Sequence, residues 1–129
     1  MRVRIRFTLL LCLLACGCRK EKSTDELIED LKSSKERDRL IAVRLLQQRK
    51  GDPAQVVPAL IGALKDTEND IRWSAAIGLG YFGKQARDAI PALEAAQRDR
   101  DARVREAAGV ALSRIDPARF RNPAKQRMK

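Results

Sequence analysis

The sequence contains no histidine, and its three cysteines all lie within the first 18 residues. Without histidine, the chain lacks the most common general base, the most common metal ligand and the side chain that titrates near neutral pH. The cysteines are too close together to join distant parts of a fold, which excludes a disulfide-stabilised scaffold. A glycine-rich phosphate-binding loop is also absent. We therefore expect no catalytic residue, no metal site and no cofactor.

Aromatic residues are scarce, at 4% of the chain, and no segment shows the alternating pattern of a β-strand. Most apolar residues are Ala, Leu, Ile and Val, which suit helices that pack closely through small side chains. A chain of 129 residues has room for one domain. The composition therefore favours a single all-α domain.

The formal net charge of +10 lies mainly at the two ends of the chain. Three arginines stand among the first six residues, and residues 114–129 carry six basic residues and one acidic residue, a net charge of +5. Subtracting these three and five charges from ten leaves only +2 for residues 16–113. A nucleic-acid-binding domain needs a basic stripe on a folded face, so nucleic acid is an unfavoured partner.

Residues 1–18 have the three-part layout of an export signal. The basic start is followed by a nine-residue apolar stretch over residues 7–15. As a helix this stretch rises about 14 Å, at ~1.5 Å per residue, which is too short to cross a hydrocarbon core of ~30 Å. We predict a removable signal peptide over residues 1–15.

The stretch Leu13-Leu14-Ala15-Cys16-Gly17 resembles a bacterial lipobox, in which a small residue precedes a cysteine that is lipidated and becomes the new N-terminus. The resemblance implies a lipid on Cys16, with Cys18 as the second candidate, and a lipidated linker over residues 16–24. Acyl chains anchor a domain at ~0.8 kcal/mol per buried methylene. The predicted location is the cell envelope, on the periplasmic or extracellular side of a bacterial membrane. A secreted domain without lipid and a cytosolic protein are the alternatives.

The rest of the chain repeats with a period of 33 residues. Residues 57–83 align with residues 90–116 without a gap, and the first third of the chain joins at the same shift. The residues shared by all three units are Leu27/Leu60/Leu93, Arg39/Arg72/Arg105, Ala42/Ala75/Ala108 and Leu46/Leu79/Leu112. A gapless period predicts repeated structural units, at about residues 25–51, 54–83 and 87–116.

Each unit is expected to form two helices. In the second unit, Pro58 is expected in the first turn of the first helix, where its missing N–H costs nothing. Asp70 is expected to cap the second helix, and Gly83 is expected to end it. An apolar stripe at a spacing of three and four consists of Ile71, Ala75, Gly78, Leu79 and Phe82. Each helix pair is apolar along one side, so the units must stack.

The segments Ile71-Arg72-Trp73-Ser74-Ala75-Ala76-Ile77-Gly78-Leu79-Gly80 and Val104-Arg105-Glu106-Ala107-Ala108-Gly109-Val110-Ala111-Leu112 resemble the second helix of HEAT repeats. The closer likeness is to the short type that is also found in phycobilisome lyase-like proteins. The resemblance covers roughly residues 25–116. It implies a short α-solenoid of about three antiparallel helix pairs.

An arginine and an aspartate recur with the period, at Arg39, Arg72 and Arg105 and at Asp66 and Asp99. The resemblance implies that these residues pair between neighbouring repeats, and a ligand-facing role is the alternative. Exposed ion pairs of this kind stabilise a fold by only ~0–1 kcal/mol.

The second helices of such solenoids line a concave face. On this face Trp73 occupies a position held by Leu40 and Glu106 in the other units, so the fold itself does not require an aromatic residue there. A partly exposed tryptophan above small residues is typical of a binding hot spot, whereas covering the neighbouring helix is the alternative. The candidate partner-binding residues are Trp73, Leu40, Gln47 and Glu106. Tyr81 is expected to pack at the seam between repeats.

Residues 117–129 contain two prolines, five basic residues and no helical periodicity. They predict a basic, disordered tail. Its charge would draw it to anionic lipid or an acidic polymer, with Phe120 available to insert or stack, while a plain solvated tail is the alternative.

Together these features predict a membrane-anchored, non-catalytic scaffold that docks a protein or peptide partner on its concave face. Three repeats are close to the minimum for a stable stack, so partner binding or homo-oligomerisation would complete the core. Two other functions stay open. One is a lyase-like accessory module for a pigment or prosthetic group, and the other is binding of anionic polymers by the basic tail.

Overall fold

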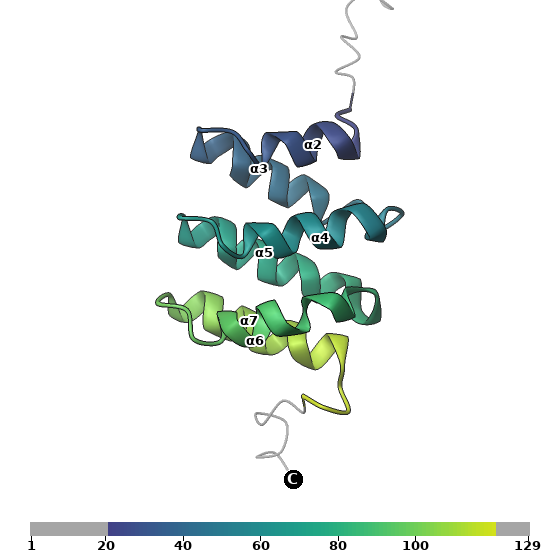
Figure 1. Ribbon diagram of the computed structural model, residues 1–129, viewed down its shortest axis with the longest axis vertical. Coiled ribbons are helices and arrows are strands. Elements are labelled where there is room, and N and C mark those ends of the chain that lie inside the picture. The colour runs from purple at the N-terminus through teal and green to yellow at the C-terminus, as the bar shows by residue number, and fades with distance from the viewer. Residues whose placement is uncertain (1–20, 121–129) are drawn as a thin grey trace, which may run out of the picture.

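The structure, a computed structural model, describes residues 21–120, which form a stack of three helix pairs (Figure 1). The first pair is α2 (Thr24–Asp30) with α3 (Glu36–Leu46), and the second is α4 (Pro53–Ala63) with α5 (Asn69–Phe82). The third consists of the 3-10 helix η1 (Gly83–Ala89), α6 (Ile90–Ala96) and α7 (Ala102–Ile115). No strand occurs within these residues. The predicted all-α class and short α-solenoid are confirmed.

Several predictions fall outside the described residues. These are the signal peptide, the lipid sites Cys16 and Cys18, and the part of the basic tail over residues 121–129. Among the helices of residues 21–120, none is long and apolar enough to cross a membrane.

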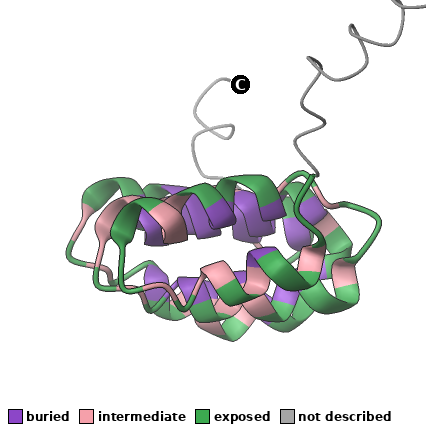
Figure 2. Ribbon diagram, turned by 90° about the horizontal axis from the view of Figure 1, so that it is seen from above, coloured by how far each residue is buried: buried purple, intermediate pink, exposed green. Residues whose placement is uncertain are grey.

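The helices form two layers with the core between them (Figure 2). One layer holds the first helix of each pair and the other holds α3, α5 and α7. The leucines shared by all repeats are fully buried between the layers, namely Leu27, Leu60, Leu93, Leu46, Leu79 and Leu112. Burying each such side chain contributes about 1.5–3 kcal/mol, and this burial explains why leucine recurs every 33 residues.

Local signals at the helix ends agree with the prediction in part. Helix α2 begins with a capping box, in which Ser23 Oγ accepts from the Glu26 N–H and the Glu26 carboxylate accepts from the Ser23 N–H. Helix α5 ends at Gly83, whose φ of +52° is a backbone conformation that suits glycine. The predicted cap at Asp70 is wrong, because the N-cap is Glu68. Asp70 instead lies in the first turn, where a carboxylate favours the helix dipole.

The predicted position of Pro58 in a first turn is also wrong. Helix α4 begins at Pro53, so Pro58 lies inside the helix, where its missing N–H leaves the carbonyl of Ala54 without its helical donor. Its repeat equivalent Pro91 does lie in the first turn of a helix, α6. The two repeats differ because η1 replaces the first part of that helix in the third pair.

Residues 117–120 are not disordered, contrary to the prediction for the tail. The Phe120 N–H donates to the carbonyl of Asp116 at 2.9 Å, and the Phe120 ring packs against the core. Arg119 pairs with Glu94 at 2.8 Å. Phe120 therefore stabilises the end of the stack instead of standing free to insert into a membrane.

Two arginine–aspartate pairs join neighbouring repeats, which confirms the predicted structural pairing. Nε and Nη2 of Arg39 donate to the carboxylate of Asp66 at 2.8 and 3.1 Å. Arg72 binds Asp99 in the same way, at 2.8 and 3.0 Å. The expectation of exposed pairs is wrong, because the Arg72 side chain is 7% exposed and that of Asp99 is 12% exposed. Loss of one partner is therefore costly.

Candidate protein-binding groove

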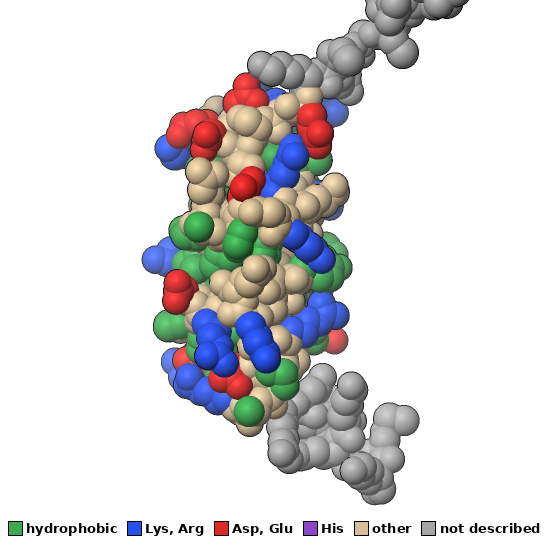
Figure 3. All heavy atoms as spheres, turned by 90° about the vertical axis from the view of Figure 1, so that its right-hand side faces the viewer, with side chains coloured by type: hydrophobic (Ala, Val, Ile, Leu, Met, Phe, Trp, Pro, Cys, Tyr) green, Lys and Arg blue, Asp and Glu red, His purple; other side chains and the backbone are tan. Residues whose placement is uncertain are grey.

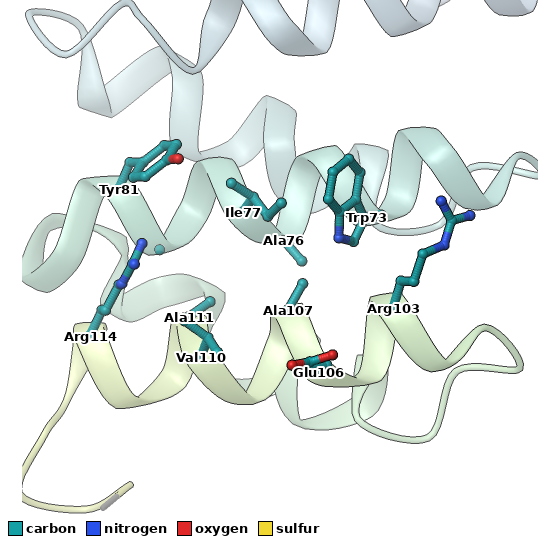
Figure 4. Close-up of a pocket in the computed structure, with 11 residues that line it drawn as sticks. Trp73, Ala76, Ile77, Tyr81, Arg103, Glu106, Ala107, Val110, Ala111 and Arg114 are labelled. Atoms are coloured by element: carbon teal, nitrogen blue, oxygen red, sulfur yellow. The ribbon is translucent and has the colours of Figure 1, made fainter. Parts of the chain in front are cut away.

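A groove of about 430 Å³ runs between α5 and α7 on the layer of second helices (Figure 4). Its lining consists of Trp73, Ala76, Ile77, Gly80 and Tyr81 from α5 and Arg103, Glu106, Ala107, Val110, Ala111 and Arg114 from α7. Most of these side chains are small or apolar, and the charged ones stand at its rim. The groove therefore offers an apolar floor between polar edges.

Small residues set the depth of the groove. A Cβ atom at Gly80 would lie 3.2 Å from Cα and 3.3 Å from Cβ of Ala111, so only glycine allows the two helices to approach this closely. Ala76 and Ala107 are buried in the same seam. Between the two ends, Ile77, Glu106 and Val110 are the only lining residues larger than alanine.

One end of the groove is aromatic with balanced charge. The half-buried Trp73 packs partly against the core, and the guanidinium carbon of Arg103 lies 5.9 Å from the centroid of its ring. Nη2 of Arg103 donates to Asp70 at 2.9 Å and to Asp101 at 3.1 Å. The hydrogen bonds that Asp101 accepts, chiefly the side-chain bond from Arg103, hold its pKa well below its usual range. Arg103 therefore has carboxylate partners already.

The other end is aromatic and positively charged. Tyr81 lies at the seam between repeats, as predicted, but its side chain is 51% exposed instead of packed inside the seam. Arg114 and Lys50 lie 5.6 and 5.9 Å from the centroid of its ring. Among residues 21–120 neither cation has a carboxylate partner. This end can therefore attract an anionic group.

The structure brings together two of the four predicted partner-binding residues. Trp73 and Glu106 line the groove. Leu40 packs against the core instead, and Nε2 of Gln47 donates to the carbonyl of Ser74 at 2.7 Å, which ties α3 to α5. The sequence reasoning missed Tyr81, although its spacing of eight residues from Trp73 places both rings on one face of a helix.

The described residues hold few groups suited to chemistry. No cluster of three or more Cys, Asp or Glu residues in residues 21–120 could hold a metal ion. Every buried polar side-chain atom in this part of the chain has a hydrogen-bond partner. What the groove presents is contact area, two aromatic rings and positive charge.

Comparisons with known proteins agree with this architecture. The family model described as HEAT repeats matches residues 24–120. The solved complex of CpcE and CpcF of phycocyanin lyase from Nostoc sp. PCC7120 is similar to the chain, with 29% sequence identity and a TM-score of 0.68. That match covers 78% of this chain and 40% of the other chain, so the chain spans less than half the length of this neighbour. No curated protein matches the sequence. The predicted likeness to short, lyase-like HEAT repeats is confirmed.

Proposed function

Because the chain belongs to the HEAT-repeat family, we propose that it is a non-catalytic docking module that binds a segment of a partner protein between α5 and α7. The observation that carries the proposal is the placement of Trp73 and Tyr81 at the two ends of an apolar groove. They are the only tryptophan and the only tyrosine of the chain. Tryptophan, tyrosine and arginine are the residues most enriched in binding hot spots, and this groove contains all three.

The charges at the groove indicate the chemistry of the bound segment. Its apolar side chains would cover the floor and the Trp73 ring. A carboxylate of the segment would lie near Arg114 and Lys50, where a charge-assisted hydrogen bond is available. Arg103 contributes less, because Asp70 and Asp101 already balance its charge. The proposed ligand is therefore an apolar segment with an acidic residue at one end.

A displayed library of random twelve-residue peptides tests this proposal on the full mature chain. We expect selection to enrich apolar peptides that carry Asp or Glu toward one end, and the enrichment to disappear with Tyr81→Ser or Arg114→Gln. Arg87→Gln is the matched control, because Arg87 is exposed on η1, outside the groove. The emission of Trp73 reports binding directly, since no other tryptophan is present. No enrichment, or enrichment that survives both groove variants, would refute the proposal.

We also propose that a lipid on Cys16, or on Cys18, presents this groove at a bacterial membrane in the cell envelope. The support is the lipobox resemblance of the N-terminal segment. Mass spectrometry of the mature N-terminus tests it. A diacylated or triacylated cysteine is the expected result, and an intact Met1 would contradict it while leaving the groove proposal standing.

The similarity to the phycocyanin lyase complex favours a second candidate, a lyase-related accessory module that handles a pigment or prosthetic group. In that case the groove would hold a chromophore instead of a peptide. Visible absorbance that co-purifies with the chain and quenches Trp73 emission would favour this candidate. A colourless chain that enriches peptides would favour docking of a protein. Binding of anionic polymers by residues 121–129 stays a prediction, because that segment lies outside the described residues.

A further inference from the structure

The arginines of the inter-repeat pairs are held in a fixed orientation by backbone carbonyls. Nη1 of Arg72 donates to the carbonyls of Asp66 and Thr67 at 2.9 and 3.0 Å. This leaves Nε and Nη2 directed at both oxygens of Asp99 in the next repeat. The first and second repeats therefore each present a preformed two-pronged donor to an aspartate in the turn between the two helices of the next repeat.

Arg105 of the third repeat has the same fixed orientation but no aspartate. Its Nη1 donates to the carbonyls of Asp99 and Arg100 at 2.8 and 3.1 Å, which are the positions 33 residues after Asp66 and Thr67. Its Nε and Nη2 donate to no acceptor among the described residues. Residues 117–129, which follow α7, contain no Asp or Glu. The third repeat thus presents an oriented donor that has no carboxylate acceptor among residues 21–120.

We propose that Arg105 marks a docking surface at the α7 end of the stack, which binds a helix pair of another protein with a carboxylate in the turn between its helices. The two pairs between repeats show the required geometry, and bidentate binding of a carboxylate by a guanidinium is strong and geometrically specific. The partner would continue the stack as a fourth helix pair.

A second copy of this chain is a poor occupant of the surface. Ser33 stands at the turn position where the other repeats carry Asp66 and Asp99, so a copy added head to tail would present a hydroxyl there. Helix α2 carries four acidic residues in its sequence TDELIED, but none of them lies at this turn position. On the face in Figure 3, acidic side chains gather near the α2 end and basic ones near the α7 end. These complementary charges would let copies approach head to tail, but the turn of a copy supplies no carboxylate to Arg105, so the proposed partner is a different chain with an acidic docking surface.

An NMR titration of the full mature chain with sodium acetate tests the open donor. We expect the Nε–H signal of Arg105 to shift and saturate at a lower acetate concentration than that of Arg87, which is exposed and lacks orienting carbonyl bonds. The signal of Arg72 should not move, because its carboxylate is in place. If Arg105 responds no more strongly than Arg87, its donors are not preformed and the proposal fails.

A chain extended by one helix pair tests the docking itself. A second copy of residues 83–116 is placed directly after Ile115, with either Asp or Ser at the position equivalent to Asp99. We expect the Asp form to melt about 4 °C or more above the Ser form, and Arg105→Lys to abolish this difference. Equal melting temperatures of the Asp and Ser forms with Arg105 present would overturn this proposal, but they would leave the groove proposal intact.

Sedimentation of the unextended chain tests the identity of the occupant. Self-association that Arg105→Lys abolishes would identify a second copy as the occupant and overturn the assignment to a different chain.

Discussion

The substitution Asp99→Asn measures how firmly one repeat holds the next. It removes the negative charge that pairs with Arg72 but preserves the shape of the side chain. The bond that Asp99 Oδ1 accepts from the Asp101 N–H, at 2.9 Å, can persist with an amide oxygen. Arg72, whose side chain is only 7% exposed, is then left without its counter-charge.

The expected loss of unfolding free energy follows from the burial of Arg72 and Asp99. Removing one partner of a buried ion pair costs about 3–5 kcal/mol. An asparagine still accepts one hydrogen bond and the pair is not fully enclosed, so we expect the free energy of unfolding to fall by about 2–3 kcal/mol. A loss of this size lowers the melting temperature of a domain of about 100 residues by roughly 8–24 °C. Thermal and urea unfolding followed by circular dichroism measure both quantities.

A second ion pair between the same two repeats supplies the control. Asp70 and Arg103 are 46% and 53% exposed and lie 2.9 Å apart. Because solvent screens this pair, Asp70→Asn should cost less than about 1 kcal/mol. If Asp70→Asn and Asp99→Asn lower the melting temperature equally, burial does not decide the strength of these pairs and the reasoning is wrong.

The same pair predicts how stability depends on pH. Hydrogen bonds from Arg72 lower the pKa of Asp99. Burial raises the pKa of Asp66, but the bonds from Arg39 and from the Glu68 N–H outweigh it, so that pKa is also lowered. A carboxyl group whose folded pKa lies below its unfolded value of ~3.9 contributes its full stability above that pH. This stability is lost as the pH falls through the folded pKa. The unfolding free energies of the wild type and Asp99→Asn should therefore converge below about pH 4, and parallel curves would contradict the assignment.

Four further substitutions test the packing by urea unfolding. Gly80→Ala should destabilise the fold by about 1–3 kcal/mol, because the new methyl group would meet Cα of Ala111 at 3.2 Å. Gly62→Ala, in α4, should stabilise the fold by up to about 1 kcal/mol, because no atom lies within 4 Å of the added Cβ. Equal effects of Gly80→Ala and Gly62→Ala would argue against a close approach of α5 and α7. Gly83→Ala should cost about 1 kcal/mol or more, since φ is +52° there, and a neutral result would contradict this strain. Leu112→Ala should cost about 2–5 kcal/mol because Leu112 is fully buried, and a loss below 1 kcal/mol would place it outside the core.

The periodicity of the sequence predicted the stacking but not every helix boundary. Leucine at positions 60, 93 and 112 identified buried faces because a core position tolerates few residue types. The same 33-residue spacing predicts identical helix boundaries in every repeat, but η1 replaces part of a helix in the third pair alone. The spacing of apolar residues fixes which face is buried, whereas the choice between 3-10 and α-helix depends on local hydrogen bonds. This is why the prediction for Pro58 was wrong, although the equivalent Pro91 does lie in the first turn of a helix.

The candidate site was predicted only in part, because equivalent positions of the repeats have different surroundings. Trp73 stood out because its repeat equivalents are not aromatic, and it does line the groove. The repeat pattern predicts that Gln47 lies on the same face as Trp73, but the two seams of the stack are filled differently. A Cβ atom at Gly78 would lie 2.6 Å from Cγ of Gln47, so the side chain of Gln47 occupies the seam between α3 and α5. Equivalent positions in a repeat protein share a fold but not always an environment.

The contact between Gly80 and Ala111 makes the distance between the walls of the groove a fixed property of the free protein. The helices cannot move together without overlap of Cα and Cβ atoms, and moving them apart would expose Leu79 and Leu112 to water. A ligand would therefore meet a rigid slot that neither clamps nor widens. The ligand, and not the protein, would therefore lose most of the conformational entropy on binding. Selectivity would depend on whether the side chains of the ligand fit the width of the groove. Structures of the free and the occupied protein should superpose closely at these two helices.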